Sequence, residues 1–265
     1  MKEKLSGKWK VKSAELSIKA VVEDLAPGGT LRAAINFGNA VLVQRSPATG
    51  EPKGVSVELA KELASRLGLP LEYVTYEAAG KVCEVLKNDE WDIAFLAIDP
   101  NRALEIAFTE PYVVIEGSYM VPRNSPYQKN EELDQPGVRI AVGANAAYDL
   151  YLSRTLQHAE LVRAPTTPGA VDLFLEEKLE AAAGVRYGLK QFAESNREVR
   201  LIDGHFMLIR QAMGVPISRG IGKQYLDLFI DEMITSGFIK RKLVENGQPD
   251  VTVAPAPSRG VSGNG

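Results

Sequence analysis

The chain has 265 residues, of which 45% are hydrophobic and 25% charged, and its formal net charge is −3. This length suits one large α/β domain or two smaller lobes, and the composition is that of an ordinary soluble globular protein. The sequence has no long run of Lys and Arg. Because binding to a nucleic-acid backbone needs clustered positive charge, we expect no nucleic-acid partner.

Few residues are available for a disulfide or a metal centre. Cys83 is the only cysteine, so no disulfide can form within the chain. Its helical context fits a small core residue or, alternatively, a reactive thiol. Two histidines cannot supply a His-rich metal cluster, and the sequence contains no phosphate loop, nucleophile elbow or cysteine-based zinc pattern. We therefore expect no cofactor and no metal.

The first 29 residues are polar and weakly periodic, and we expect them to form an N-terminal extension. They contain basic residues but no continuous apolar stretch, so they do not have the pattern of a signal peptide. No apolar stretch of the chain reaches the roughly 18 residues that span a bilayer.

The first half of the chain alternates strand and helix patterns. Residues 31–38 are predicted to be the first core strand. Residues 54–68 form an amphipathic helix pattern that Gly68 ends. A strand pattern at 70–77, a helical pattern at 79–90 and an apolar run of the buried-strand type at 91–98 follow. This alternation favours a parallel sheet covered by helices.

The second half repeats this alternation. Strand patterns at 137–143, 159–165, 179–185 and 199–204 alternate with helical patterns at 144–156, 169–178 and 186–195, and residues 225–247 are helical with a break at Gly237. Extended runs at 116–137 and 206–216 could cross between two halves. We therefore predict an α/β fold: a two-lobe clamshell in which each lobe is a mostly parallel sheet covered by helices, joined by two crossover strands, that closes around a ligand.

The residues that follow each strand are the candidates for a ligand site, because ligands in open α/β sheets bind beyond the carboxyl ends of the strands. After the strand at 91–98, Asp99 and Pro100 predict a helix start, which places Arg102 in the first turn. A helix N-terminus favours an anion, and the guanidinium group suits a carboxylate or phosphate. A surface ion pair with Glu105 is the alternative.

Other strand ends offer further candidates. Residues 36–39 follow the first strand and offer the amides of Asn36 and Asn39 and an aromatic ring. Phe37 could form an apolar wall or be an ordinary core residue. Residues 143–149 are small enough for a ligand to approach the backbone, with Asn145 and Ala146 as candidates; a tight turn capped by Asn145 is equally compatible. Thr166 and Thr167 could cap a helix or donate to an anion. Arg186 could be a second cation or a solvated helix end.

Residues 92–112, "DIAFLAIDPNRALEIAFTEPY", resemble the signature of bacterial solute-binding proteins of family 3, which serve ABC-type importers of polar amino acids. In that family an apolar strand leads to a short turn, an arginine and an "FS-P-Y"-like run. Residues 54–74, 136–149 and 229–247 resemble the family's first helix and second strand, the start of its second lobe and its closing helices. The likeness covers about residues 30 to 247.

The resemblance implies a type II periplasmic binding protein fold, in which lobe 1 is formed by both chain ends and lobe 2 is inserted. We expect residues 30–118 and 211–250 in lobe 1, 119–210 in lobe 2, and a flexible tail at 251–265. In that family the matched arginine holds the ligand carboxylate, and this role carries over to Arg102. The position after the first strand carries over to Asn36, next to Phe37.

Two departures from the family pattern bear on the ligand. Phe95 and Ala97 stand where family members commonly have a small residue and a hydroxyl. Near residue 185, where amino-acid binders have an acid for the α-ammonium group, this chain has Gly184, Val185 and Arg186. A buried ammonium without a polar partner is costly. An organic acid or dianion held by Arg102, with Arg186 as the candidate second cation, therefore fits better than a plain amino acid, although Glu116 could still receive an amine.

The resemblance implies a monomeric, non-enzymatic binding protein for a small anionic or amino-acid-like ligand, with an ABC-type permease as its partner if it is exported. An enzyme similar to cyclohexadienyl dehydratases and an intracellular ligand sensor are the alternatives. A dehydratase needs a positioned general acid beside the carboxylate. The family implies a periplasmic location if a leader was removed; the cytoplasm is the alternative.

Overall fold

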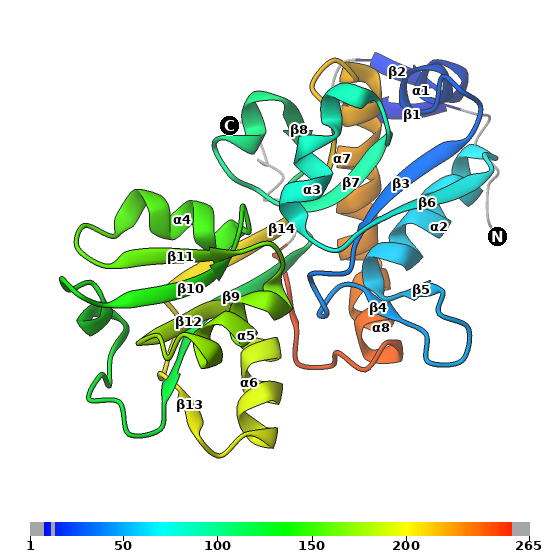
Figure 1. The fold of residues 1–265 in the computed structure, drawn as a ribbon. Helices are drawn as coiled ribbons and strands as arrows, with labels where there is room; N and C mark the ends of the chain where they lie inside the picture. Colours follow the sequence, from blue (N-terminus) through cyan, green and yellow to red (C-terminus); the bar gives the residue numbers. More distant parts are fainter. Residues whose placement is uncertain (1–7, 12–13, 256–265) are drawn as a thin grey trace, which may run out of the picture.

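The computed structural model describes residues 8–11 and 14–255, and it shows two lobes side by side, joined by two long strands (Figure 1). The predicted two-lobe α/β fold is confirmed. The joining strands are β9 (Val113–Pro122) and β14 (Met207–Pro216), which pair antiparallel over residues 113–117 and 207–211. The predicted lobe boundaries at 118/119 and 210/211 fall inside these strands.

Lobe 1 contains three parallel strands in the spatial order β6, β3, β7, with β14 antiparallel beside β7. These strands are β3 (Leu31–Asn36), β6 (Leu71–Tyr76) and β7 (Ile93–Ala97). The helices of this lobe are α1 (Ile18–Leu25), α2 (Val55–Leu67), α3 (Ala79–Glu84), α7 (Gly220–Thr235) and α8 (Phe238–Glu245).

Lobe 2 repeats this arrangement. Its parallel strands have the spatial order β11, β10, β12, with β9 antiparallel beside β12. The elements are β10 (Arg139–Gly143), β11 (Glu160–Ala164), β12 (Ala181–Val185), α4 (Ala147–Thr155), α5 (Thr167–Glu176) and α6 (Arg186–Ser195). In each lobe the chain's first strand lies between the second and the third, so the strand ends of the two lobes can face one another.

Short elements complete the fold. They are β1 (Lys8–Val11), β2 (Ala14–Ser17), β4 (Gln44–Arg45), β5 (Pro52–Lys53), β8 (Ile106–Phe108), β13 (Val199–Leu201) and β15 (Thr252–Val253), with the 3-10 turns η1 (Leu86–Asn88), η2 (Arg102–Leu104) and η3 (Asn130–Leu133). No helix in the described ranges is long and apolar enough to cross a membrane.

Helix ends follow the sequence signals closely. Gly68 adopts a left-handed conformation with φ 67° at the end of α2, and Gly237, with φ 70°, separates α7 from α8 as predicted. Three predicted elements differ. The helix expected after Asp99 is only a single 3-10 turn, η2, which ends at Leu104. In the predicted N-terminal extension, α1 buries Val21 and Leu25 against α7.

The third difference is at the C-terminus. Within the predicted flexible tail, β15 pairs with β9, and the backbone N–H of Ala254 donates to the carbonyl of Tyr112. Residues 256–265 lie outside the described residues. Both chain ends thus contact lobe 1 elements, which adds to the buried surface of that lobe.

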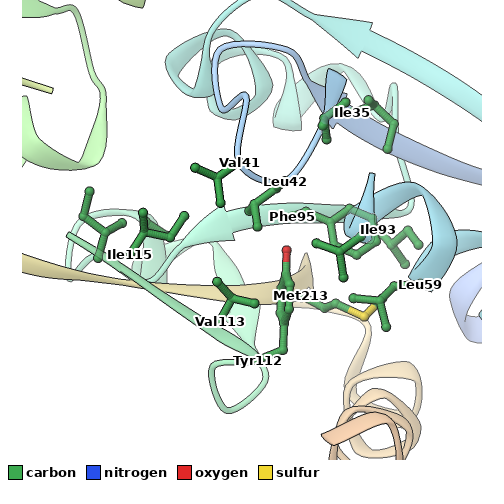
Figure 2. Close-up of a cluster of buried hydrophobic side chains, with 14 of the residues drawn as sticks. Ile35, Val41, Leu42, Leu59, Ile93, Phe95, Tyr112, Val113, Ile115 and Met213 are labelled. Carbon is green, nitrogen blue, oxygen red and sulfur yellow. The ribbon is translucent and has the colours of Figure 1, made fainter. Parts of the chain in front are cut away.

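The core of lobe 1 reaches the cleft through Phe95. Figure 2 shows Phe95 and Tyr112 among aliphatic side chains that include Leu59, Ile93 and Met213. The rings of Phe95 and Tyr112 meet edge to face, with centroids 6.3 Å apart, and the Tyr112 hydroxyl lies 3.1 Å from the Ser56 hydroxyl. Phe95 is therefore anchored by the core, and it presents a fixed apolar surface toward the strand ends.

Candidate functional site

A cavity of about 40 Å³ lies between the lobes at the carboxyl ends of the parallel strands. Lobe 1 contributes Asn36 at the end of β3 and Phe95 and Ala97 at the end of β7. Lobe 2 contributes Gly143 at the end of β10 and Val185 at the end of β12. This is the position in which open α/β sheets bind their ligands, and we call it the cleft cavity.

Arg102 lines the cleft cavity with a side chain that is only 6% exposed. Its Nη1 donates to the carbonyl of Ala97 over 3.1 Å, and its Nη2 donates to the carbonyl of Asn145 over 2.8 Å. Asn145 belongs to lobe 2, so the guanidinium group bridges the lobes. Burial lowers the pKa of Arg102, and the neighbouring Cys83 and Asp99 oppose that shift. The guanidinium has five N–H groups, and these two bonds leave others for a ligand.

The turn that carries Arg102 is held on both sides. The backbone N–H of Asn101 donates to the Asp99 carboxylate over 2.9 Å. Asp99 is not the helix N-cap that the sequence predicted, because the 3-10 turn η2 begins after Asn101, which makes no side-chain cap bond. The other Asp99 oxygen forms a 2.8 Å ion pair with Arg154 of α4, across the cleft. The Asp99 side chain is 3% exposed. Asp99 thus fixes the turn and ties it to lobe 2.

Side-chain amides from lobe 1 and from the crossover face the same cavity. Asn36 and Asn39 use their Oδ1 atoms to accept the backbone N–H groups of Gly38 and Val41, at 2.9 and 3.3 Å. Their Nδ2 groups make no hydrogen bond to the described part of the chain. Gln211 of β14 is 5% exposed, and its side-chain amide likewise has no partner there. Because these side chains line the cavity, their N–H groups are available to a ligand that accepts hydrogen bonds.

Two helices of lobe 2 begin at the cleft cavity. Ala146 and Ala147 line it at the start of α4, and Thr166 and Thr167 line it at the start of α5. Thr166 caps α5, since its hydroxyl accepts the backbone N–H of Gly169 over 3.1 Å. Helix N-termini carry partial positive charge and favour anions. Together with Arg102 and the three amides, the cavity is rich in donors and suited to a carboxylate.

The titratable residues of the lining are Arg102 and Tyr148. Burial raises the pKa of Tyr148, whose hydroxyl donates to that of Thr167 over 3.2 Å. Among the described residues that line the cavity there is no Asp, Glu, His, Lys or Cys, and no group of such residues elsewhere in the described ranges could hold a metal ion. The lining therefore offers hydrogen-bond donors and apolar walls rather than acid–base chemistry.

The structure brings together six of the nine predicted site residues. Asn36, Phe95, Ala97, Arg102, Ala146 and Thr166 line the cleft cavity, whereas Phe37, Asn145 and Arg186 do not. Phe37 lines a neighbouring hollow, and Asn145 contributes its carbonyl to Arg102. Whether any of them binds a ligand stays a prediction.

Arg186 begins α6, as predicted, but its guanidinium group is bound elsewhere. It pairs with Glu116 over 3.4 Å and donates to the Ser118 hydroxyl and the Gly204 carbonyl, at 3.2 and 2.6 Å. Glu116, the candidate for receiving an amine, also pairs with His205 over 3.5 Å. Neither side chain lines the cleft cavity, which leaves Arg102 as its one cation among the described lining residues.

Asn39 and Thr167, which also follow predicted strands, line the cavity as well. Sequence reasoning missed the contributions of Tyr148, Ile209 and Gln211. Gln211 has no such strand-end signal, because it lies in the middle of an extended run, and only the pairing of β14 with β7 at Ala97 brings it to the cavity.

The two lobes, the crossover strands and the cavity between the strand ends have the arrangement of two-lobed solute-binding proteins. The family model for bacterial extracellular solute-binding proteins, family 3, matches residues 41–249. The chain therefore belongs to this family. No curated protein sequence matches this chain.

Solved structures of binding proteins share the fold. The amino acid ABC transporter substrate-binding protein AbpA from Streptococcus pneumoniae, bound to L-arginine, has a TM-score of 0.73 and 20% identity, over 86% of this chain and 98% of that one. The cysteine-binding protein from Campylobacter jejuni has a TM-score of 0.72 and 18% identity, over 86% and 92%. The ancestral amino acid-binding protein AncCDT-1, a precursor of cyclohexadienyl dehydratase, has a TM-score of 0.70 and 18% identity, over 84% and 97%.

Proposed function

We propose that this protein captures a small carboxylate-bearing metabolite in the cleft cavity and delivers it to an ABC-type importer. The observation that carries the proposal is the set of unpaired donors around Arg102. Asn36, Asn39 and Gln211 each present an amide without a partner in the described chain, next to the single cation of the lining. A carboxylate has enough lone pairs to accept several of these donors at once.

The lining also bears on which carboxylate is bound. Val185 stands at the lobe 2 strand end where the family pattern suggests an acid for an α-ammonium group, and it lines the cavity with an apolar side chain. Arg186 and Glu116 pair with each other outside the cavity. An ammonium group placed here would be buried without an anionic partner, which is costly. An organic acid without a free α-amino group therefore suits the site better than an amino acid.

The first test is a thermal-shift screen of amino acids and organic acids against wild type and Arg102→Ala. A ligand that binds only the folded protein raises its melting temperature with occupancy. We expect the best hit to be a carboxylate without an α-amino group. Arg102→Ala should weaken it by about 1.5–3 kcal/mol, roughly ten- to hundredfold in Kd. The control is Arg241→Ala, a surface position on α8. If the ligand binds Arg102→Ala as tightly as wild type, Arg102 does not hold the ligand carboxylate.

A dehydratase-like enzyme is the alternative in the family context. The chemistry needs a general acid next to the bound carboxylate, and the described lining supplies only Tyr148, whose pKa is raised and whose hydroxyl is already bonded to Thr167. We therefore expect no phenylpyruvate to form when the protein is incubated with prephenate. Ultraviolet absorbance of phenylpyruvate is the measurement. Product that forms in wild type and not in Arg102→Ala would overturn the binding-only function.

Delivery to an importer requires that the protein acts outside the cytoplasmic membrane. The description of the family as extracellular supports this location. Fractionation of cells that express the native gene is the corresponding test. Recovery of the protein only with the cytoplasm would favour an intracellular ligand sensor instead.

A further inference from the structure

The cleft cavity is too small for a whole metabolite of ordinary size. A water molecule needs roughly 10–15 Å³ of such volume, so about 40 Å³ holds only a few heavy atoms. A carboxylate group with one or two carbons occupies it. The remainder of a larger ligand must extend into an adjoining space.

A second hollow, of about 290 Å³, adjoins the cleft cavity and shares Gly38, Thr167 and Val185 with it. It also lies between the lobes, and we call it the tail pocket. Lobe 1 supplies the loop after β3, including Phe37 and Val41, and lobe 2 supplies parts of α5, β12 and α6. Because Val185 forms part of both walls, the two spaces lie on either side of one residue, and a ligand that uses both has to extend past it.

The walls of the tail pocket are almost entirely apolar. They include Phe37, Val41, Pro168, Val171, Ala183, Leu189 and Phe192. The polar residues of the lining are partnered or exposed. The Thr167 hydroxyl accepts a hydrogen bond from Tyr148, the Tyr187 hydroxyl accepts one from Gln191, and Asp172 is exposed. An apolar pocket next to a donor-rich cavity is suited to an apolar group attached to an acceptor.

The ring of Phe37 is held in place at this pocket. The Arg45 guanidinium carbon lies 3.7 Å from the ring centroid, and Arg45 also pairs with Glu77 over 2.5 Å. A cation over an aromatic face stabilises the ring orientation. The pocket wall contributed by lobe 1 is therefore a preformed apolar surface rather than a freely rotating side chain.

Two other hollows adjoin the cleft, and both are less suited to an apolar group. One, of about 350 Å³, lies beyond Arg102 and is lined by Glu84 and Glu105. The Arg102 bond to Asn145 lies between it and the cleft cavity. The other, of about 260 Å³, contains Arg210 and the ion pair of Asp99 with Arg154. The tail pocket is the one through which an uncharged hydrocarbon extends without facing these charges.

We propose that the ligand is a monocarboxylate with an apolar tail and no α-ammonium group. Its carboxylate lies against Arg102 and the amides of the cleft cavity, and its hydrocarbon or aromatic tail fills the tail pocket past Val185. An apolar cavity of about 150 Å³ is enough for benzene, so a phenyl ring or a chain of similar size fits. This inference rests on the proposed function and adds the ligand class to it.

The test is isothermal titration calorimetry with propionate, hexanoate, 3-phenylpropionate and L-norleucine. Burial of each methylene should tighten binding about fourfold, so we expect hexanoate and 3-phenylpropionate to bind at least tenfold more tightly than propionate. L-Norleucine is hexanoate with an α-amino group, and we expect it to bind more weakly than hexanoate. Val185→Asp should reverse that order by supplying an anionic partner for the ammonium group.

A filling variant tests the direction of the tail. A Cβ atom added at Gly188, which lines the tail pocket, meets nothing within 4 Å, so Gly188→Phe introduces a ring at the pocket wall without a clash at Cβ. We expect this variant to bind propionate as wild type does and to lose the extra affinity for hexanoate. Gly220→Phe is the matched control, because Gly220 is equally uncrowded and lies at the start of α7.

The outcomes separate the two proposals. If propionate binding depends on Arg102 and hexanoate is no tighter, the tail inference is wrong and the carboxylate function stands. If Gly188→Phe keeps the full preference for hexanoate, the tail lies elsewhere and the inference is again overturned. Tighter binding of L-norleucine than of hexanoate overturns the exclusion of the ammonium group. If none of the four carboxylates binds, the proposed function fails as well.

Discussion

At the scale of single residues, the donors of the cleft cavity differ in how firmly they are held. In both Asn36 and Asn39 the amide oxygen accepts a hydrogen bond from a nearby backbone N–H. Gln211 has no hydrogen bond from its side chain to the described chain, although it is only 5% exposed. Because Gln211 lines the cleft cavity, its amide is available to a ligand there. Of these three residues, Gln211 therefore has the weakest structural role in the ligand-free protein.

We predict that Gln211→Leu weakens binding of a carboxylate ligand by about 1 kcal/mol, roughly fivefold in Kd, while the ligand-free protein keeps or gains stability. Calorimetric titration and urea unfolding measure the two effects. Gln157→Leu, at an exposed position after α4, is the control. A variant that loses stability without losing affinity would show that Gln211 supports the fold instead.

At the scale of elements, each lobe uses the same device to fix its first strand. Arg32 of β3 donates its backbone N–H and its Nε to Asp92, just before β7. Arg139 of β10 donates the same two groups to Glu180, just before β12. In each lobe an arginine at the start of one parallel strand thus binds an acid at the start of its neighbour. This repeat sets the strand register and hence the positions of the strand ends at the cleft.

The two pairs differ in burial, and this difference gives a prediction. Asp92 is 1% exposed, whereas the side chains of Arg139 and Glu180 are 39% and 29% exposed. Arg32→Ala removes the side-chain donors that bind the buried Asp92 carboxylate. We expect it to lower the free energy of unfolding by roughly 1.5–3 kcal/mol. Arg139→Ala should have a smaller effect, because exposed ion pairs contribute little. Urea denaturation of both variants provides the comparison, and equal losses would contradict this reading of burial.

At the scale of the whole molecule, three contacts hold the lobes together across the cleft. Arg102 donates to the carbonyl of Asn145, Arg154 pairs with Asp99, and α3 approaches the turn before α4 closely at Gly80. These contacts surround the cleft cavity, so closure and access to the cavity are coupled. Substitutions that affect only these contacts should shift the balance between open and closed forms.

Gly80→Ala tests the close approach. A Cβ atom at this position would lie 2.7 Å from Cβ of Asn145, and Asn145 has little freedom to move because it has a φ of 58°. We expect the lobes to separate, with a larger radius of gyration in small-angle X-ray scattering and weaker ligand binding. Gly220→Ala, where no atom lies within 4 Å, is the control. An unchanged radius together with unchanged affinity would contradict the closed arrangement.

Arg154→Ala tests the ion pair. Its loss leaves the Asp99 carboxylate buried without its cationic partner in the closed form, whereas opening exposes it to water. We therefore expect a shift toward the open form in scattering and weaker binding through a lower population of the closed form. Lys190→Ala removes an exposed pair within α6 and should change neither measurement. If both variants behave alike, the Asp99 pair does not govern closure.

The sequence by itself determined most of the local structure. Alternating strand and helix patterns, Gly68 and Gly237 as helix ends, and Arg186 as a helix start all follow from periodicity and backbone preference, which act over a few residues. The segment around Arg102 was also sufficient to indicate the family, because its order of strand, turn and arginine is local. Six of the predicted site residues reached the cleft cavity because parallel strands bring their carboxyl ends to one edge.

Only the tertiary structure decided which side chains meet. The sequence shows Arg186 at a helix start, but the antiparallel pairing of β12 with β9 brings it to Ser118 and away from the cavity. It shows Gln211 within an extended run, and the pairing of β14 with β7 places it opposite Ala97. The tail pocket likewise exists only because Phe37 of one lobe faces Val185 and Phe192 of the other. These contacts join residues far apart in the chain, so no local pattern carries them.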